Sequence, residues 1–198
     1  MMNKNRIMQC LIIKIMVPFA LFLSSLAIMP AAISADLPLS ENSSGANIIL
    51  MRHALAPGTG DPANFDVDDC TTQRNLSQQG IRQAKTIGAT LAAQGLTPTR
   101  ILSSPWCRCK DTAEALGLGP WEVHPGLSSF YQGHVDKTET LALLRKELQQ
   151  FGDDELVLFV THQVVISALT GIYVKSGGYL LENSSRFQGA VAKAVKGM

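Results

Sequence analysis

Two histidines, His53 and His162, each follow a run of apolar residues, and Arg52 directly precedes His53. A neutral imidazole is a good nucleophile near neutral pH, because its unperturbed pKa is about 6.5. A second arginine, Arg108, follows a third short apolar run. Arginine binds anions well, since its planar guanidinium can grip two oxygens at once and stays charged. Gathered at one place, these residues would suit phosphoryl transfer, which requires in-line placement and neutralisation of charge.

The apolar runs that precede these residues are predicted to be strands of a parallel sheet. They cover residues 48–51, 100–103 and 156–160. A short continuous apolar run is typical of a strand that is buried on both faces. Ligands of open α/β sheets bind beyond the carboxyl ends of the strands. The histidines and arginines are therefore expected to meet at one edge of the sheet.

Helical segments alternate with these strands, which predicts an α/β fold with a mainly parallel sheet covered on both faces. Ser77 can cap a helix that ends at Gly95, and Pro105 is expected in the first turn of a helix that carries Arg108. Further helices are expected over residues 138–150 and 164–170, short strands over 121–124 and 179–181, and a long loop over 54–72. That loop could form one wall of a pocket, and Arg74 just after it could face the same pocket.

The strand-end segments resemble the histidine phosphatase (phosphoglycerate mutase-like) superfamily. Its signature has a strand ending in R-H-G, an S-P-x-x-R segment and a strand ending in a second histidine. The matching segments here are Arg52-His53-Ala54, Ser104-Pro105-Trp106-Cys107-Arg108 and Thr161-His162, with Arg74-Asn75-Leu76-Ser77 between the first two. The resemblance covers roughly residues 48–171 and implies a three-layer α/β/α sandwich.

The resemblance also implies roles for the site residues. His53 would take the phosphoryl group as a covalent phosphohistidine, and Arg52, Arg108 and His162 would hold the phosphate. Water would then hydrolyse the intermediate, with no metal and no other cofactor. The substrate would be a small phosphorylated compound or a phosphoprotein.

Three positions depart from the family pattern. Ala54 stands where the family has glycine, and Ser129 stands where many members carry a glutamate that donates a proton. Another branch uses an aspartate directly after the second histidine, where this chain has Gln163. Asp136 and Glu139 are possible replacements for the acid, although each could simply begin a helix. These departures leave open an alternative function, a catalytically weak or inactive protein of the same fold that binds phosphorylated ligands.

Residues 1–35 are predicted to be a signal peptide, and residues 36–198 a single histidine phosphatase domain. A basic start is followed by the almost wholly apolar stretch 15–33 and by small residues that suit cleavage after Ala35. An uncleaved membrane anchor is the alternative. The expected location is periplasmic or secreted, with no stable membrane insertion after cleavage. The formal net charge of +1 gives no indication of nucleic-acid binding.

Three cysteines, Cys70, Cys107 and Cys109, follow the predicted signal peptide. Disulfides persist outside the cytoplasm. Cys107 and Cys109 lie two apart on a predicted helix and point in different directions, so they should not pair with each other. A bridge from Cys70 to one of them is predicted, and the sequence does not say which. A cysteine metal site is the alternative, but a fourth ligand is not apparent.

Overall fold

The structure is a computed structural model that describes residues 45–152 and 154–187. The predicted signal peptide and its cleavage site after Ala35 lie outside the described residues. Within the described ranges, no helix has the length and apolar character needed to cross a bilayer.

A five-stranded sheet forms the centre of the fold, in the order β3-β2-β4-β1-β5. Its strands are β1 (Ile48–Arg52), β2 (Arg100–Ser103), β3 (Glu122–Val123), β4 (Val157–Thr161) and β5 (Tyr179–Glu182). Strands β1 to β4 run parallel to one another, and β5 is antiparallel to β1. Arg52 pairs with Thr161, and Ser103 pairs with Val160. The strands that precede His53, Ser104 and His162 therefore end at the same edge, as the sequence predicts.

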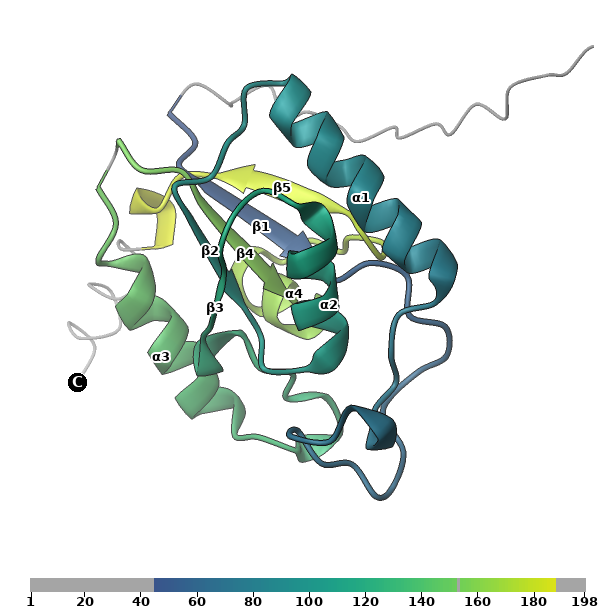
Figure 1. Ribbon diagram of the computed structural model, residues 1–198. Helices are drawn as coiled ribbons and strands as arrows, with labels where there is room; N and C mark the ends of the chain where they lie inside the picture. Colours follow the sequence, from purple (N-terminus) through teal and green to yellow (C-terminus); the bar gives the residue numbers. More distant parts are fainter. Residues whose placement is uncertain (1–44, 153, 188–198) are drawn as a thin grey trace, which may run out of the picture. The chain divides into compact units, whose positions relative to one another are not determined.

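Helices cover both faces of the sheet (Figure 1). Side chains alternate along β1, so that Ile49 and Met51 pack in one core cluster while Ile48 and Leu50 pack in another. The first cluster includes residues of α1 (Gln78–Ala93) and α2 (Cys107–Leu116). The second includes residues of α3 (Lys137–Leu148) and α4 (Gln163–Thr170). The predicted three-layer α/β/α sandwich is confirmed.

The start of α1 lies against the chain that follows His53. Ser77 caps this helix, since its Oγ accepts a hydrogen bond from the Gly80 N–H at 3.0 Å. A Cβ at Gly80 would lie 2.1 Å from the Leu55 carbonyl oxygen, so only glycine allows the two backbones to approach this closely. Gly95, which adopts a φ of +73°, follows the helix as expected.

The second helix begins later than the sequence predicts. Trp106 is the N-cap of α2, so Pro105 lies outside the first turn, and that prediction is wrong. The N-cap Trp106 is extended and makes no side-chain capping hydrogen bond. Arg108 nevertheless lies in the first turn, as expected. The loop after His53 is irregular until a 3₁₀ turn at Cys70–Thr72, and two further 3₁₀ turns, Pro125–Leu127 and Tyr131–Gly133, connect β3 to α3.

Candidate active site

His53 lies directly after β1, and it is placed by one hydrogen bond of its backbone and one of its ring. Its N–H donates to the Thr161 carbonyl at 2.9 Å, and its ring Nδ1 lies 2.8 Å from the Ala54 carbonyl oxygen. Because a carbonyl oxygen can only accept, Nδ1 must carry the hydrogen in this arrangement. The other ring nitrogen, Nε2, then carries the lone pair, and a nucleophilic attack requires that lone pair.

The His53 ring stays neutral over a wide pH range. Burial, followed by the positive charge of Arg108, lowers its pKa to about 3. Arg74 and Arg52 act in the same direction, while the hydrogen bond to Ala54 opposes them. A neutral imidazole among three arginines is a nucleophile placed where an anion would be attracted.

His162 lies directly after β4 and faces His53. The two ring centroids are 5.5 Å apart, with an angle of 65° between the planes. The His162 Nε2 lies 2.8 Å from the Ser104 hydroxyl and 3.4 Å from the Cys109 sulfur. Burial, followed by the charge of Arg108, holds the His162 pKa well below its usual value. The structure thus brings together the two histidines that the sequence singled out.

Arg52 is held at the end of β1 by the segment before β5. Its Nη1 donates to the Tyr173 hydroxyl at 3.2 Å and to the Val174 carbonyl at 3.1 Å. Gln163 positions that segment, because its Oε1 accepts from the Val174 N–H at 2.9 Å and its Nε2 donates to the Ile172 carbonyl at 3.1 Å. Gln163, which stands where one branch of the family has an aspartate, therefore has a structural role in holding this segment.

Arg108 is paired with a carboxylate that the sequence analysis did not single out. Its Nη1 and Nη2 donate to the two carboxylate oxygens of Asp61 at 2.7 and 3.2 Å. Both side chains are only 3% exposed. The Trp106 indole N–H also donates to Asp61, at 3.1 Å. Burial alone would raise the Asp61 pKa, but the hydrogen bonds from Arg108, the Arg74 N–H and Trp106 lower it, so the carboxylate stays charged.

The two arginines keep a buried donor each for a further ligand. The Nε groups of Arg52 and Arg108 are buried and have no hydrogen-bond partner in the described part of the chain. Buried donors are normally satisfied, and an anion would satisfy these two. With its terminal nitrogens on Asp61, Arg108 would contact a phosphate through Nε. The two-oxygen grip through the terminal nitrogens is available only if Asp61 moves.

Two other sequence features have clear positions. Arg74 donates to the carbonyls of Gly60 and Ala56, and so holds the loop that carries Asp61. Ala54 is fully buried, and its N–H donates to the Thr112 hydroxyl at 3.0 Å. Among the described non-glycine residues, only Gln132 has a positive φ. Ala54 therefore does not need the left-handed backbone that would require the family's glycine.

The segment where the family carries an acid holds no carboxylate near its expected place. Ser129 is buried, while Asp136 and Glu139 are exposed. Asp136 caps α3, since its carboxylate accepts from the Glu139 N–H at 2.8 Å. This placement agrees with the interpretation of both residues as acids at a helix start. A role for either one as proton donor stays a prediction.

A disulfide links the loop to the helix that carries Arg108. Cys70 pairs with Cys107 at a Cα–Cα distance of 5.7 Å, which confirms the predicted bridge and identifies its partner. Cys109 is free and fully buried, and burial raises its pKa to about 12. Within the ranges that the structure describes, no three His, Cys, Asp or Glu side chains are grouped to hold a metal ion.

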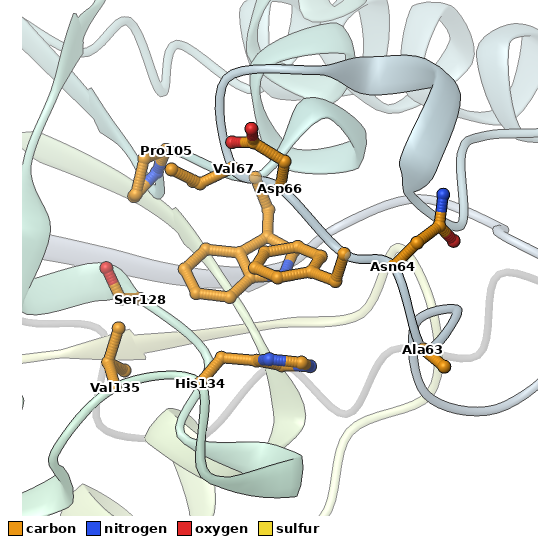
Figure 2. A pocket seen from close by; sticks show the side chains of 10 residues that line it. Ala63, Asn64, Asp66, Val67, Pro105, Ser128, His134 and Val135 are labelled. Atoms are coloured by element: carbon orange, nitrogen blue, oxygen red, sulfur yellow. The ribbon is translucent and has the colours of Figure 1, made fainter.

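An open cavity of about 650 Å³ is lined in part by Trp106, whose ring meets His162 edge-on at 5.4 Å (Figure 2). Part of the loop after His53 forms one wall, which agrees with the prediction for that loop. The segment between β3 and α3 forms another. The lining residues are Ala63, Asn64, Phe65, Asp66, Val67, Pro105, Trp106, Ser128, His134 and Val135.

The sequence matches the model of the histidine phosphatase superfamily (branch 1) over residues 48–151, more than half of the 198-residue chain. The chain belongs to this superfamily, which supports a phosphohydrolase activity. The matched range contains Arg52, His53 and Arg108 and ends before His162. The comparison with curated protein sequences finds no match.

Several solved structures resemble the structure of this chain, although their sequence identity to it is low. One is ecdysone phosphate phosphatase from Bombix mori in complex with tungstate, with a TM-score of 0.50, 12% identity, and coverage of 67% of this chain and 86% of that one. Another is the open reading frame Rv3214 from Mycobacterium tuberculosis, with a TM-score of 0.50, 16% identity, and coverage of 67% and 88%. The protein histidine phosphatase SixA complexed with tungstate gives a TM-score of 0.48 at 21% identity, with coverage of 70% and 90%. The first two likenesses support the fold.

Proposed function

We propose that the protein is an extracytoplasmic phosphatase that works through a covalent phosphohistidine on His53 and needs no metal. The observation that carries the proposal is the hydrogen bond from Nδ1 of His53 to the Ala54 carbonyl. It leaves the lone pair on Nε2, in a ring that burial keeps neutral. Arg52 and Arg108 supply positive charge beside this nucleophile, and their Nε donors have no partner within residues 45–152 and 154–187.

The reaction would proceed in two steps. Nε2 forms a bond to phosphorus while the bond from phosphorus to the leaving atom breaks, and the electron pair goes to the leaving group. The ring gains positive charge in this step, and the hydrogen bond from Nδ1 to the Ala54 carbonyl stabilises it. Water then attacks the phosphohistidine, which releases phosphate and returns the electron pair to Nε2. The arginines offset the charge on the phosphate oxygens in both steps.

The test is to trap the intermediate. Brief exposure of the purified protein to a phosphorylated substrate, alkaline quenching and mass spectrometry should place a phosphate on His53. The variant His53→Ala should have neither the label nor turnover. His124→Ala is a matched control, because His124 caps a 3₁₀ turn through the Gly126 N–H and lies outside the site. Full activity in His53→Ala, or a label on another residue, would refute the proposal.

A second candidate is a phospho-ligand-binding protein with weak or no turnover. The pairing of Arg108 with Asp61 favours it, because the carboxylate occupies the terminal nitrogens that would otherwise grip a phosphate. The lack of a carboxylate at Ser129 and Gln163 favours it as well. Phosphate or phosphonate binding by calorimetry, without turnover of any compound in a broad phosphatase screen, would support this candidate over the enzyme.

The proposed location is periplasmic or secreted. Two observations support it, the signal-like residues 1–35 and the disulfide between Cys70 and Cys107. The proposed partner is a small phosphorylated substrate or a phosphoprotein. We expect no binding to nucleic acid and no stable membrane insertion after signal cleavage. Fractionation of cells that express the full chain, followed by N-terminal sequencing, would test both the location and cleavage after Ala35.

A further inference from the structure

The guanidinium of Arg108 has one edge bound by the protein and one edge open. Its Nη1 donates to Oδ1 of Asp61 at 2.7 Å and to the Arg74 carbonyl at 3.4 Å, and its Nη2 donates to Oδ2 of Asp61 at 3.2 Å. A guanidinium has five N–H donors in a fixed geometry, so the Nε–H and the second N–H of Nη2 remain. Nη2 is the terminal nitrogen on the Nε side, and these two donors therefore form a fork along one edge. Such a fork matches two oxygens of a phosphate.

The open edge of Arg108 is buried close to the nucleophile. Its Nε is buried and has no hydrogen-bond partner within residues 45–152 and 154–187. A buried donor without a partner is costly, and an anion would satisfy it. Of the three arginines that lower the pKa of His53, Arg108 has the largest effect, and it also lowers the pKa of His162. An anion on the open edge of Arg108 would therefore lie near both histidines.

Asp61 is a fixed carboxylate, because each of its oxygens accepts two hydrogen bonds. Oδ1 accepts from Arg108 and from the Arg74 N–H at 3.1 Å, and Oδ2 accepts from Arg108 and from the Trp106 indole N–H at 3.1 Å. The Asp61 N–H in turn donates to Oε1 of Gln132 at 2.7 Å. A phosphate that displaced Asp61 from Arg108 would leave a buried carboxylate without its cation, which is costly. We therefore expect a phosphate to bind at the open edge with the ion pair intact.

The loop that carries Asp61 is also fastened to α2 beside Arg108. Cys107, the residue before Arg108, forms the disulfide with Cys70 of the loop. The Cys107 N–H donates to Oε1 of Gln73 at 3.0 Å. These links fix the loop against the first turn of the helix, so the carboxylate and the guanidinium keep one relative orientation.

We propose that Asp61 is a positioning residue, which occupies the terminal nitrogens of Arg108 and so aims the edge formed by Nε and Nη2 at the phosphate of the substrate. This inference rests on the proposed function and deepens it, because it states how the clamp is presented. Arg52 is arranged in the same way: its Nη1 donates to the Tyr173 hydroxyl and the Val174 carbonyl, while its buried Nε has no partner in the described part of the chain. Charge alone would make Asp61 unfavourable for anion binding. The positioning effect has the opposite sign, which makes the proposal testable.

The first experiment uses the wild-type protein and needs no variant that exposes a buried charge. Inorganic phosphate is added to the disulfide-bonded protein, and the Nε–H signal of Arg108, assigned through its side-chain bonds, is followed by ¹H–¹⁵N NMR. Phosphate at the open edge should shift this signal strongly, because the Nε–H gains a charged acceptor. Phosphate that binds and leaves the signal unchanged would overturn the proposal.

The variant Asp61→Asn tests the sign of the effect. It keeps the size of the side chain but removes the charge and one of the two acceptor oxygens. Phosphate affinity, measured by calorimetry, should fall at least about tenfold, the loss typical of a hydrogen bond to a charged group. Asp68→Asn removes the same charge from an exposed position of the same loop, and should change the affinity by less than about twofold. Equal or tighter binding in Asp61→Asn would show that Asp61 competes with phosphate, and would overturn the proposal.

A double-variant cycle shows whether Asp61 acts through Arg108. With Arg108→Gln already in place, Asp61→Asn should change the phosphate affinity by less than about twofold, because the residue to be positioned is gone. A tenfold loss in both backgrounds would overturn the route through Arg108. The phosphohistidine assay separates this inference from the proposed function. No label on His53, with the expected affinities, would count against the enzyme alone, whereas a normal label with wild-type affinity in Asp61→Asn would count against the positioning role alone.

Discussion

Removing one partner of the buried pair of Asp61 and Arg108 should strongly reduce the stability of the protein. The perturbation is Asp61→Leu, which leaves the Arg108 guanidinium charged and nearly inaccessible to water, since its side chain is 3% exposed. Breaking a buried pair from one side typically costs about 3–5 kcal/mol. The total free energy of unfolding of a domain is only about 5–15 kcal/mol, so the loss would be large. Urea unfolding of the disulfide-bonded protein, followed by tryptophan fluorescence, measures it.

A double variant tests the physical reason. Replacing both charges, as in Asp61→Leu with Arg108→Met, removes the uncompensated charge and should recover most of the loss, because apolar replacements of buried pairs are often neutral or stabilising. Asp68→Leu, at an exposed aspartate of the same loop, is the control and should change stability by no more than about 0.5 kcal/mol. A cost below about 1 kcal/mol for Asp61→Leu, as for a surface pair, would refute the reasoning. So would a double variant that is no more stable than the single one.

Three further predictions concern pH, the disulfide and the leaving group. The unfolded chain protonates His53 near pH 6.5 but the folded protein does so only near pH 3, so between these values the contribution of His53 to stability should fall by about 1.4 kcal/mol per pH unit as pH drops. Urea midpoints at several pH values should show a shallower slope in His53→Gln, and an unchanged slope would contradict the shift. Cys70→Ser should cost about 3–4 kcal/mol and abolish the sensitivity of stability to reductant, which the wild type should show. Finally, the rate of hydrolysis of a series of phosphate monoesters should fall steeply as the pKa of the leaving group rises, because Ser129 and Gln163 supply no acid. Equal rates across the series, with a large loss of activity in Asp136→Asn or Glu139→Gln, would instead identify that residue as the proton donor.

The arrangement of the fold could largely be predicted from the sequence. The apolar runs before His53 and His162 predict buried parallel strands, and both strands end at the same edge of the sheet. These features depend on short-range periodicity, which a strand of a few residues already displays. The start of α2 was predicted too early, because the proline rule allows a helix to begin at Pro105 but does not require it.

Tertiary structure decided the details that set the chemistry. Asp61 contacts Arg108 across 47 positions of the chain, and no local pattern distinguishes it from the other aspartates of that loop. The partner of Cys70 is Cys107 because that side of α2 faces the loop, while Cys109 points into the core toward His162.

The residue types that could perform phosphoryl transfer, and the strands that carry them, were determined by the sequence alone. Which ring nitrogen of His53 keeps its lone pair depends on the Ala54 carbonyl, and the aromatic cavity depends on segments near residues 65 and 134 meeting in space. The physical reason is that hydrogen-bond partners and shared cavities are set by the packing of distant segments. Local propensity and spacing carry no record of that packing.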